Sequence, residues 1–218
     1  MTDSNSGLLR QIKVPALITL AVTAARLIGE LLDGSELLFG SSGGGGLSLV
    51  GIAWLIPVVG FWFGYRYTED GHGPDQPGSV LMSAGLSIAV AVVATILLNV
   101  LIAPVPPMSI VYTCACAAGA SLLMLPAWPR VFFALFLYGL AARIPVIVIT
   151  FVAVRVWPTT HYARAPAGLE GGPNELAGWL SLAQLGVWVP ATIVLGGLAA
   201  SLGAMFSSRR RAQLEANT

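Results

Sequence analysis

Long hydrophobic segments alternate with short polar connections along the whole chain. Six segments are apolar enough, and long enough or nearly so, to cross a bilayer as helices: 14–33, 47–65, 79–103, 108–125, 131–157 and 176–206. Strands of a membrane barrel would instead alternate apolar and polar residues over about 10 positions. The pattern therefore predicts an all-α protein, a polytopic transmembrane helical bundle of about six spans.

The predicted bundle is one domain between two polar tails. We expect a cytoplasmic amino-terminal tail over 1–13, a single transmembrane helical domain over 14–206 and a cytoplasmic carboxy-terminal tail over 207–218. Basic residues give this orientation, because cytoplasmic loops of membrane proteins are enriched in Lys and Arg. The predicted inner side carries Arg10, Lys13, Arg66, Arg130 and Arg209 to Arg211, and the predicted outer side carries Arg155 and Arg164. The expected location is the inner (plasma) membrane.

The first hydrophobic segment has a second interpretation. The stretch VPALITLAVTAA (14–25) also fits the core of a short signal peptide that is cleaved near Ala24. Cleavage would leave five spans with the same orientation of everything downstream, so the count of basic residues does not separate the two interpretations. Pro15 and the short apolar run before Arg26 favour the uncleaved span.

Composition supports the membrane class and narrows the chemistry. Hydrophobic residues make up 56% of the 218 residues and charged residues 10%, whereas a soluble domain carries about 25% charged residues. A net charge of +1 with no long basic tract predicts no nucleic-acid partner. His72 and His161 fall on opposite sides of the predicted membrane, and Cys114 and Cys116 point to different sides of one helix. We therefore expect no metal, no cofactor and no catalytic residues, and we interpret the cysteines as packing residues.

Two arginines interrupt the hydrophobic segments. Arg26 lies 13 residues after Lys13, and Arg143 lies 13 residues after Arg130. If Lys13 and Arg130 mark the cytoplasmic surface, both arginines lie ~20 Å into an apolar layer ~30 Å thick. An unpaired charge at that depth is costly. The side chains either extend along the lipid face to the headgroups or face the interior of the bundle.

Neighbouring polar residues favour the interior of the bundle. Thr19, Thr23, Arg26, Glu30 and Asp33 recur at intervals of three and four, which places them on one helix face. Glu30 lies one turn from Arg26 and can neutralise its charge, and Asp33 can supply a further anion from the helix end. The stripe therefore predicts an ion pair inside the protein.

Other segments add polar residues at the same predicted depth. The last segment carries Ser181, Gln184, Trp188 and Thr192 at intervals of three and four, followed by the small-residue series Gly196, Ala200 and Gly203, which we interpret as helix packing. The sequence thus predicts a sealed inner half and an outward-facing polar pocket. The predicted binding cluster is Arg26, Glu30, Arg143 and Gln184, with Thr23, Asp33 and Trp188 as further contributors.

The segment YGLAARIPVIVIT (138–150), the tripeptide THY (160–162) and the segment GIAWLIPVVG (51–60) resemble a group of uncharacterised bacterial multi-pass membrane proteins. This resemblance implies the membrane class and carries no activity, cofactor or site residue to the chain.

Two functions fit these features. The first is a small solute or ion transporter, or a channel, that uses the polar pocket; two arginines against one glutamate leave room for an anionic ligand or lipid. The alternative is a structural or assembly subunit of a membrane protein complex, whose charges bind another chain or a lipid. The expected partners are the lipid bilayer and either further copies of the chain or another membrane protein.

Overall fold

The structure is a computed structural model and describes residues 2–39, 50–102 and 105–217. These residues form helices and connections without a β-strand, so the all-α prediction is confirmed for them. The helices are α1 (Thr2–Leu31), α2 (Glu36–Phe39), α3 (Leu55–Glu69), α4 (Pro77–Ile102), α5 (Met108–Ser121), α6 (Pro129–Val156), α7 (Pro173–Ala183) and α8 (Val189–Ala216). Two 3-10 helices, η1 (Leu122–Met124) and η2 (His161–Ala163), and one π-helix, η3 (Gln184–Trp188), complete the set.

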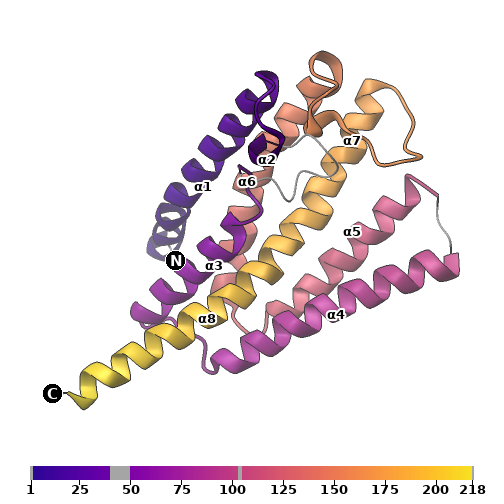
Figure 1. Ribbon diagram of the computed structural model, residues 1–218. Helices are drawn as coiled ribbons and strands as arrows, with labels where there is room; N and C mark the ends of the chain where they lie inside the picture. Colours follow the sequence, from indigo (N-terminus) through magenta and orange to yellow (C-terminus); the bar gives the residue numbers. More distant parts are fainter. Residues whose placement is uncertain (1, 40–49, 103–104, 218) are drawn as a thin grey trace.

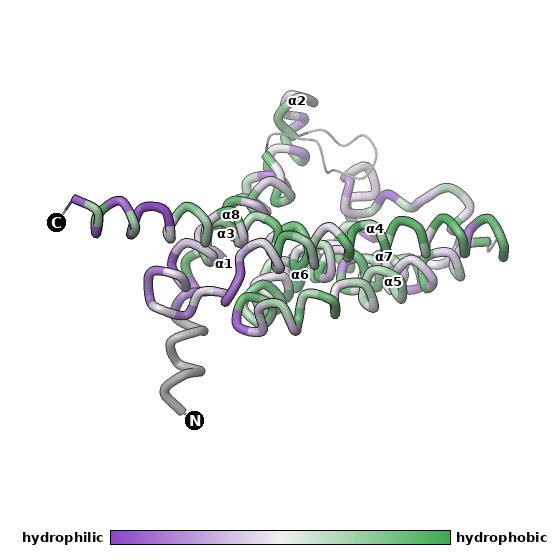
Figure 2. The backbone as a smooth tube through the Cα atoms, turned by 90° about the horizontal axis from the view of Figure 1, so that it is seen from below, coloured by the Kyte–Doolittle hydropathy of each residue, from purple (hydrophilic) through white to green (hydrophobic). Residues whose placement is uncertain are grey.

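The long helices lie side by side, and α7, η3 and α8 form one continuous rod along the molecule (Figure 1). Helices α1, α3 and α6 lie on one side of this rod, while α4 and α5 form a hairpin that diverges from the rest. Hydrophobic residues dominate the long helices, and hydrophilic residues gather at the connections and at the carboxy-terminal end of α8 (Figure 2). The arrangement is that of a helical bundle with apolar outer surfaces.

Four helices are long and apolar enough to cross a membrane: Gln11–Leu31, Pro77–Ile102, Pro129–Val156 and Pro173–Ala216. This count covers the described residues and is compatible with a membrane protein. Two further predicted spans are shorter, since Met108–Met124 has fewer than 18 residues and α3 has 15. The six-span count and the orientation of the termini stay predictions.

The predicted helix over 47–65 is wrong in its starting point. Residues 47–49 lie outside the described residues, residues 50–54 form bends and a turn, and the helix begins at Leu55. Helix α1 begins at Thr2 and α8 continues to Ala216, so residues within both predicted tails are helical, and the tail boundaries stay predictions. Hydropathy finds apolar residues but does not distinguish an apolar turn from the first turns of a helix.

Small residues bring α3 and α8 into close contact. A side chain added at Gly60 would overlap the carbonyl oxygen of Gly196, and one added at Gly64 would overlap the carbonyl oxygen of Ala200. Gly203 is equally close to the backbone of α3. Small residues at such positions let two helix backbones approach each other. The interpretation of the series in α8 as packing residues is therefore confirmed.

The hydrophobic core lies toward one end of the bundle. Its largest fully buried side chains come from α3 and α6 and include Phe63, Tyr67, Leu135 and Tyr138. A second, smaller hydrophobic cluster gathers near the other end, where Tyr162 and Ala163 pack against α6. Along α6, Arg143 lies between Tyr138 of the first cluster and Val146 of the second.

Candidate functional site

The packing of α6 against α8 determines where the side chain of Arg143 lies. A side chain atom added at Gly139 would lie 3.3 Å from a Val189 methyl group and 3.5 Å from Cβ of Thr192, so α6 lies close to α8 at this point. The two helices are antiparallel, and Arg143 follows Gly139 by one turn. Arg143 therefore faces Gln184 and Trp188, which precede Thr192 along the rod.

Gln184 and Trp188 are the first and last residues of the π-helix η3. Pro190 explains why the regular helix is interrupted here, because proline has no N–H to donate to the carbonyl of Gly186 and its ring crowds that carbonyl. The thiol of Cys114 fills the space beside Gly186 and donates to the carbonyl of Leu182 over 3.6 Å. Single-turn π-helices of this kind are frequent at functional sites.

Arg143 is buried, with 5% of its surface exposed. Its Nη1 donates to Oε1 of Gln184 at 3.4 Å, and its guanidinium lies 4.7 Å from the ring centroid of Trp188, a cation–π contact. Its Nε is buried and has no hydrogen-bond partner, and within the described part of the chain no carboxylate forms an ion pair with this guanidinium. Arg143 is thus a buried charge with incomplete hydrogen bonding.

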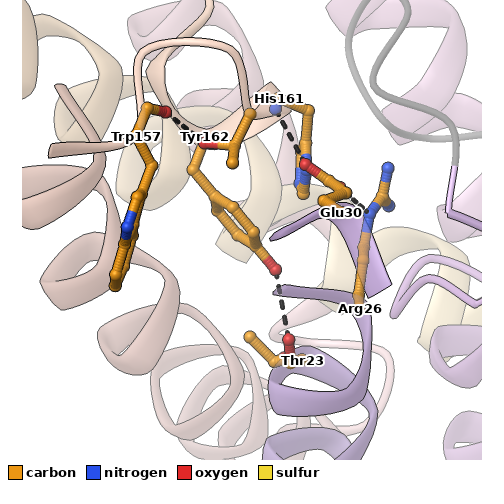
Figure 3. Close-up of polar contacts among 7 residues, drawn as sticks. Thr23, Arg26, Glu30, Trp157, His161 and Tyr162 are labelled. Carbon is orange, nitrogen blue, oxygen red and sulfur yellow. Dashed lines mark hydrogen bonds and ion pairs between the residues drawn. The ribbon is translucent and has the colours of Figure 1, made fainter. Parts of the chain in front are cut away.

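Arg26 has a carboxylate partner on its own helix (Figure 3). Its Nε donates to Oε1 of Glu30 at 3.0 Å, and the two side chains are 6% and 3% exposed. The backbone N–H of His161 donates to Oε2 of Glu30 at 3.0 Å, and Nδ1 of the same histidine contacts Oε1. Both arginines are therefore buried in the protein and do not extend along its lipid-facing surface.

His161 completes this group as a neutral side chain. Burial lowers the pKa of its imidazole, although the hydrogen bond and the charge of Glu30 oppose the shift. A neutral imidazole with the proton on Nδ1 donates to the carboxylate, which the charge of Arg26 already balances. Arg26, Glu30 and His161 together therefore carry no net charge, and the charge of Arg143 remains.

Tyr162 fixes the segment after α6 over the site. Its hydroxyl donates to the carbonyl of Thr23 at 3.3 Å, and its ring packs against Val146 and Ala153. Burial raises the pKa of Tyr162, so the phenol stays protonated and remains a donor. The hydroxyl of Thr23 donates to the backbone carbonyl of Thr19 on its own helix at 2.8 Å.

These side chains line a small, partly open cavity of about 60 Å³ with both polar and apolar walls. Five segments of the chain contribute to its lining: Thr23, Arg26, Ile52, Ala53, Arg143, Val146, His161, Tyr162, Gln184 and Trp188. The structure thus brings five of the predicted site residues to one cavity, and it places Glu30 in direct contact with two of the lining residues. It also places the turn at residues 50–54, which was predicted to be helical, in the wall of this cavity.

Asp33, the remaining predicted contributor, does not line this cavity. The helix α1 ends at Leu31, and Asp33 lies in the following turn with a φ of 50° and an exposed side chain. The anion expected from Asp33 is thus absent from the cavity wall.

His161 and Tyr162 are the site residues that the sequence prediction missed. Both lie in a connection that was predicted as an outer loop, and no periodicity places a loop residue against a helix. One signal was present: THY (160–162) begins three residues after the predicted span 131–157 ends, on the side of the membrane to which Glu30 is nearer.

No protein-family model matches the chain, and neither a curated protein nor a solved structure matches it. The function of the site is therefore argued from its own geometry.

Proposed function

We propose that the chain is a multi-pass protein of the inner (plasma) membrane that binds a small anion in this cavity and transports it, as a transporter or a channel. Both termini are cytoplasmic in this proposal, and the cavity lies toward the outer side. Four long apolar helices support the membrane location, and the excess of basic residues at one end of the bundle supports the orientation.

The observation that carries the proposal is the buried, incompletely bonded guanidinium of Arg143. A buried donor without a partner costs about 1–3 kcal/mol, and a charged one costs more. An anion in the cavity would supply both the missing acceptor and the missing negative charge. Gln184 and Trp188 do not supply that charge, because an amide oxygen and an aromatic ring are neutral.

The position of the cavity supports transport over static binding. The large buried side chains of the core, Phe63, Leu135 and Tyr138 among them, close the bundle on the cytoplasmic side of the cavity in the proposed orientation. A polar site near the outer end with a closed inner half is the arrangement of a transporter in an outward-facing or occluded state. Pro190 and η3 provide an irregular helix at the site itself, as the broken helices of many transporters do.

Anion flux into liposomes tests this function. The full chain is reconstituted in liposomes, and uptake of radiolabelled formate and chloride is followed over time. We expect uptake by the wild-type protein and its loss in Arg143→Gln, while Arg164→Gln, which changes an exposed arginine of the predicted outer loop, retains it. Equal uptake by Arg143→Gln and wild type would refute a role of Arg143 in transport.

A structural or assembly subunit is the second candidate function, and α4 is the observation that favours it. Pro77–Ile102 is the most apolar of the four long helices, yet only 6% of its most apolar 18-residue window is buried within the chain. An apolar crevice of about 370 Å³ is lined by residues of α4, α5, η3 and α8. A stoichiometric second polypeptide in the protein purified in mild detergent would favour this function, whereas a homo-oligomer without it favours transport.

A further inference from the structure

The guanidinium of Arg143 keeps unbonded donors beside the cavity that the residue lines. Nη1 is occupied by Gln184, and Trp188 covers one face of the plane. Nε has no partner, and in the described residues no acceptor is bonded to Nη2. Nε and Nη2 point the same way along one edge of the guanidinium, so this edge presents two parallel N–H donors.

We propose that the anion bound here is a planar monovalent oxyanion of the size of formate, nitrate or acetate, held side-on by the Nε–Nη2 edge of Arg143. This inference rests on the proposed function and names its substrate class. Two parallel donors match two oxygen atoms of one planar group, which is the bidentate geometry that arginine forms with carboxylates. A halide ion has no second acceptor atom and gains nothing from the pair.

The size of the cavity limits the ligand. A water molecule needs about 10–15 Å³, so a cavity of about 60 Å³ has room for roughly four to six water-sized groups. Formate, nitrate and acetate fit within this number, and sugars, nucleotides and long-chain acids do not.

The charge of the cavity selects a monovalent ion. Arg26 is balanced by Glu30, and His161 is neutral, which leaves one uncompensated positive charge on Arg143. A divalent oxyanion such as sulfate would bring a second negative charge without a partner into a buried site, and that charge is costly. The amide of Gln184 accepts from Arg143 through its oxygen and keeps its N–H groups as donors.

Binding measurements on the full chain in lipid nanodiscs test this inference. Isothermal titration calorimetry is carried out with the sodium salts of formate, nitrate, acetate, chloride, sulfate and octanoate. We expect the three planar ions to bind at least about tenfold more tightly than chloride, because the second charge-assisted hydrogen bond is present only for them. Sulfate and octanoate are expected to bind more weakly still.

Arg143→Lys is the informative variant, because lysine keeps the charge and loses the two-donor edge. The preference for planar ions over chloride should disappear in this variant, and the control Arg164→Lys should keep it. Gln184→Glu is a second variant that keeps the fold: its carboxylate lies next to Arg143 and supplies the missing charge. We expect this variant to have a raised melting temperature and to bind none of the anions.

The outcomes separate the inference from the proposed function. Chloride binding as tight as that of formate, or an unchanged preference for planar ions in Arg143→Lys, would overturn the planar-oxyanion class and leave an anion site. Tighter binding of octanoate would overturn the size limit and indicate a lipid-derived carboxylate. Absence of binding by every ion tested, chloride included, would overturn the proposed function together with the inference.

Discussion

Glu30→Gln isolates the contribution of the buried ion pair to stability. The change removes the negative charge, keeps the shape of the side chain and leaves an oxygen that accepts from the backbone of His161. The partner distance is 3.0 Å and both side chains are almost fully buried. Two unit charges ~4 Å apart at an effective dielectric constant of ~20 attract each other by about 4 kcal/mol. Loss of one partner from a buried pair costs about 3–5 kcal/mol in measured cases, which agrees.

A double-mutant cycle measures this coupling directly. Arg26→Gln in addition to Glu30→Gln removes the charge that the first change leaves unpaired, so part of the stability should return. The expected coupling free energy is about 1–3 kcal/mol. Unfolding by sodium dodecyl sulfate in mixed micelles, followed by far-ultraviolet circular dichroism, gives the free energy of unfolding of each variant.

Glu69→Gln is the matched control. It breaks the ion pairs of Glu69 with Arg66 at 3.7 Å and with Arg210 at 3.8 Å. The arginine side chains are 48% and 60% exposed, and that of Glu69 is 32% exposed. A pair this exposed contributes at most about 1 kcal/mol. If Glu30→Gln costs no more than Glu69→Gln, or if the effects of Arg26→Gln and Glu30→Gln are additive, the buried pair does not stabilise the site.

Three further predictions follow from the packing, the site and the orientation. Gly64→Ala should destabilise the protein by at least about 1–3 kcal/mol, because its methyl group would overlap the backbone of α8, whereas Gly85→Ala in α4 meets no atom and should be neutral or stabilising in the same unfolding assay. Burial lowers the pKa of His161 in the folded protein, so on acidification the unfolded chain takes up this proton at a higher pH than the folded protein does. The free energy of unfolding should therefore be constant above pH ~6.5 and fall as the pH drops below that value. This dependence should weaken in His161→Gln and stay unchanged in His72→Gln, which alters an exposed histidine. A cysteine at position 168 in a chain without Cys114 and Cys116 should react with an impermeant maleimide added outside intact cells; labelling only after lysis would reverse the proposed orientation.

Helical periodicity predicted the parts of the site that lie on a single helix. The intervals of three and four from Thr19 to Glu30 place these residues on one face, and the structure buries that face and pairs Arg26 with Glu30. The small residues Gly196 and Ala200 were identified for the same reason. In both cases the information is local, because the geometry of one helix fixes which residues share a face.

Contacts between distant segments could not be predicted in this way. His161 reaches Glu30 only because the connection after α6 returns to the bundle and is held there by Tyr162. Asp33 was misplaced for a related reason, since the spacing of the stripe does not show that α1 ends at Leu31. The π-helix that begins at Gln184 had one signal in the sequence, Pro190. Proline has no N–H, so the carbonyl four residues before it loses its helical hydrogen bond.

The central claim is that a small anion completes the hydrogen bonding of Arg143, and a structure determined in lipid in the presence of sodium nitrate tests it most directly. We predict density for one small planar ion in the cavity, with oxygen atoms about 2.7–2.9 Å from Nε and Nη2 of Arg143. The claim would be contradicted if these nitrogens were instead bonded to a carboxylate or carbonyl of this chain or of another polypeptide, or to water alone. A carboxylate from a second polypeptide would at the same time favour the assembly subunit.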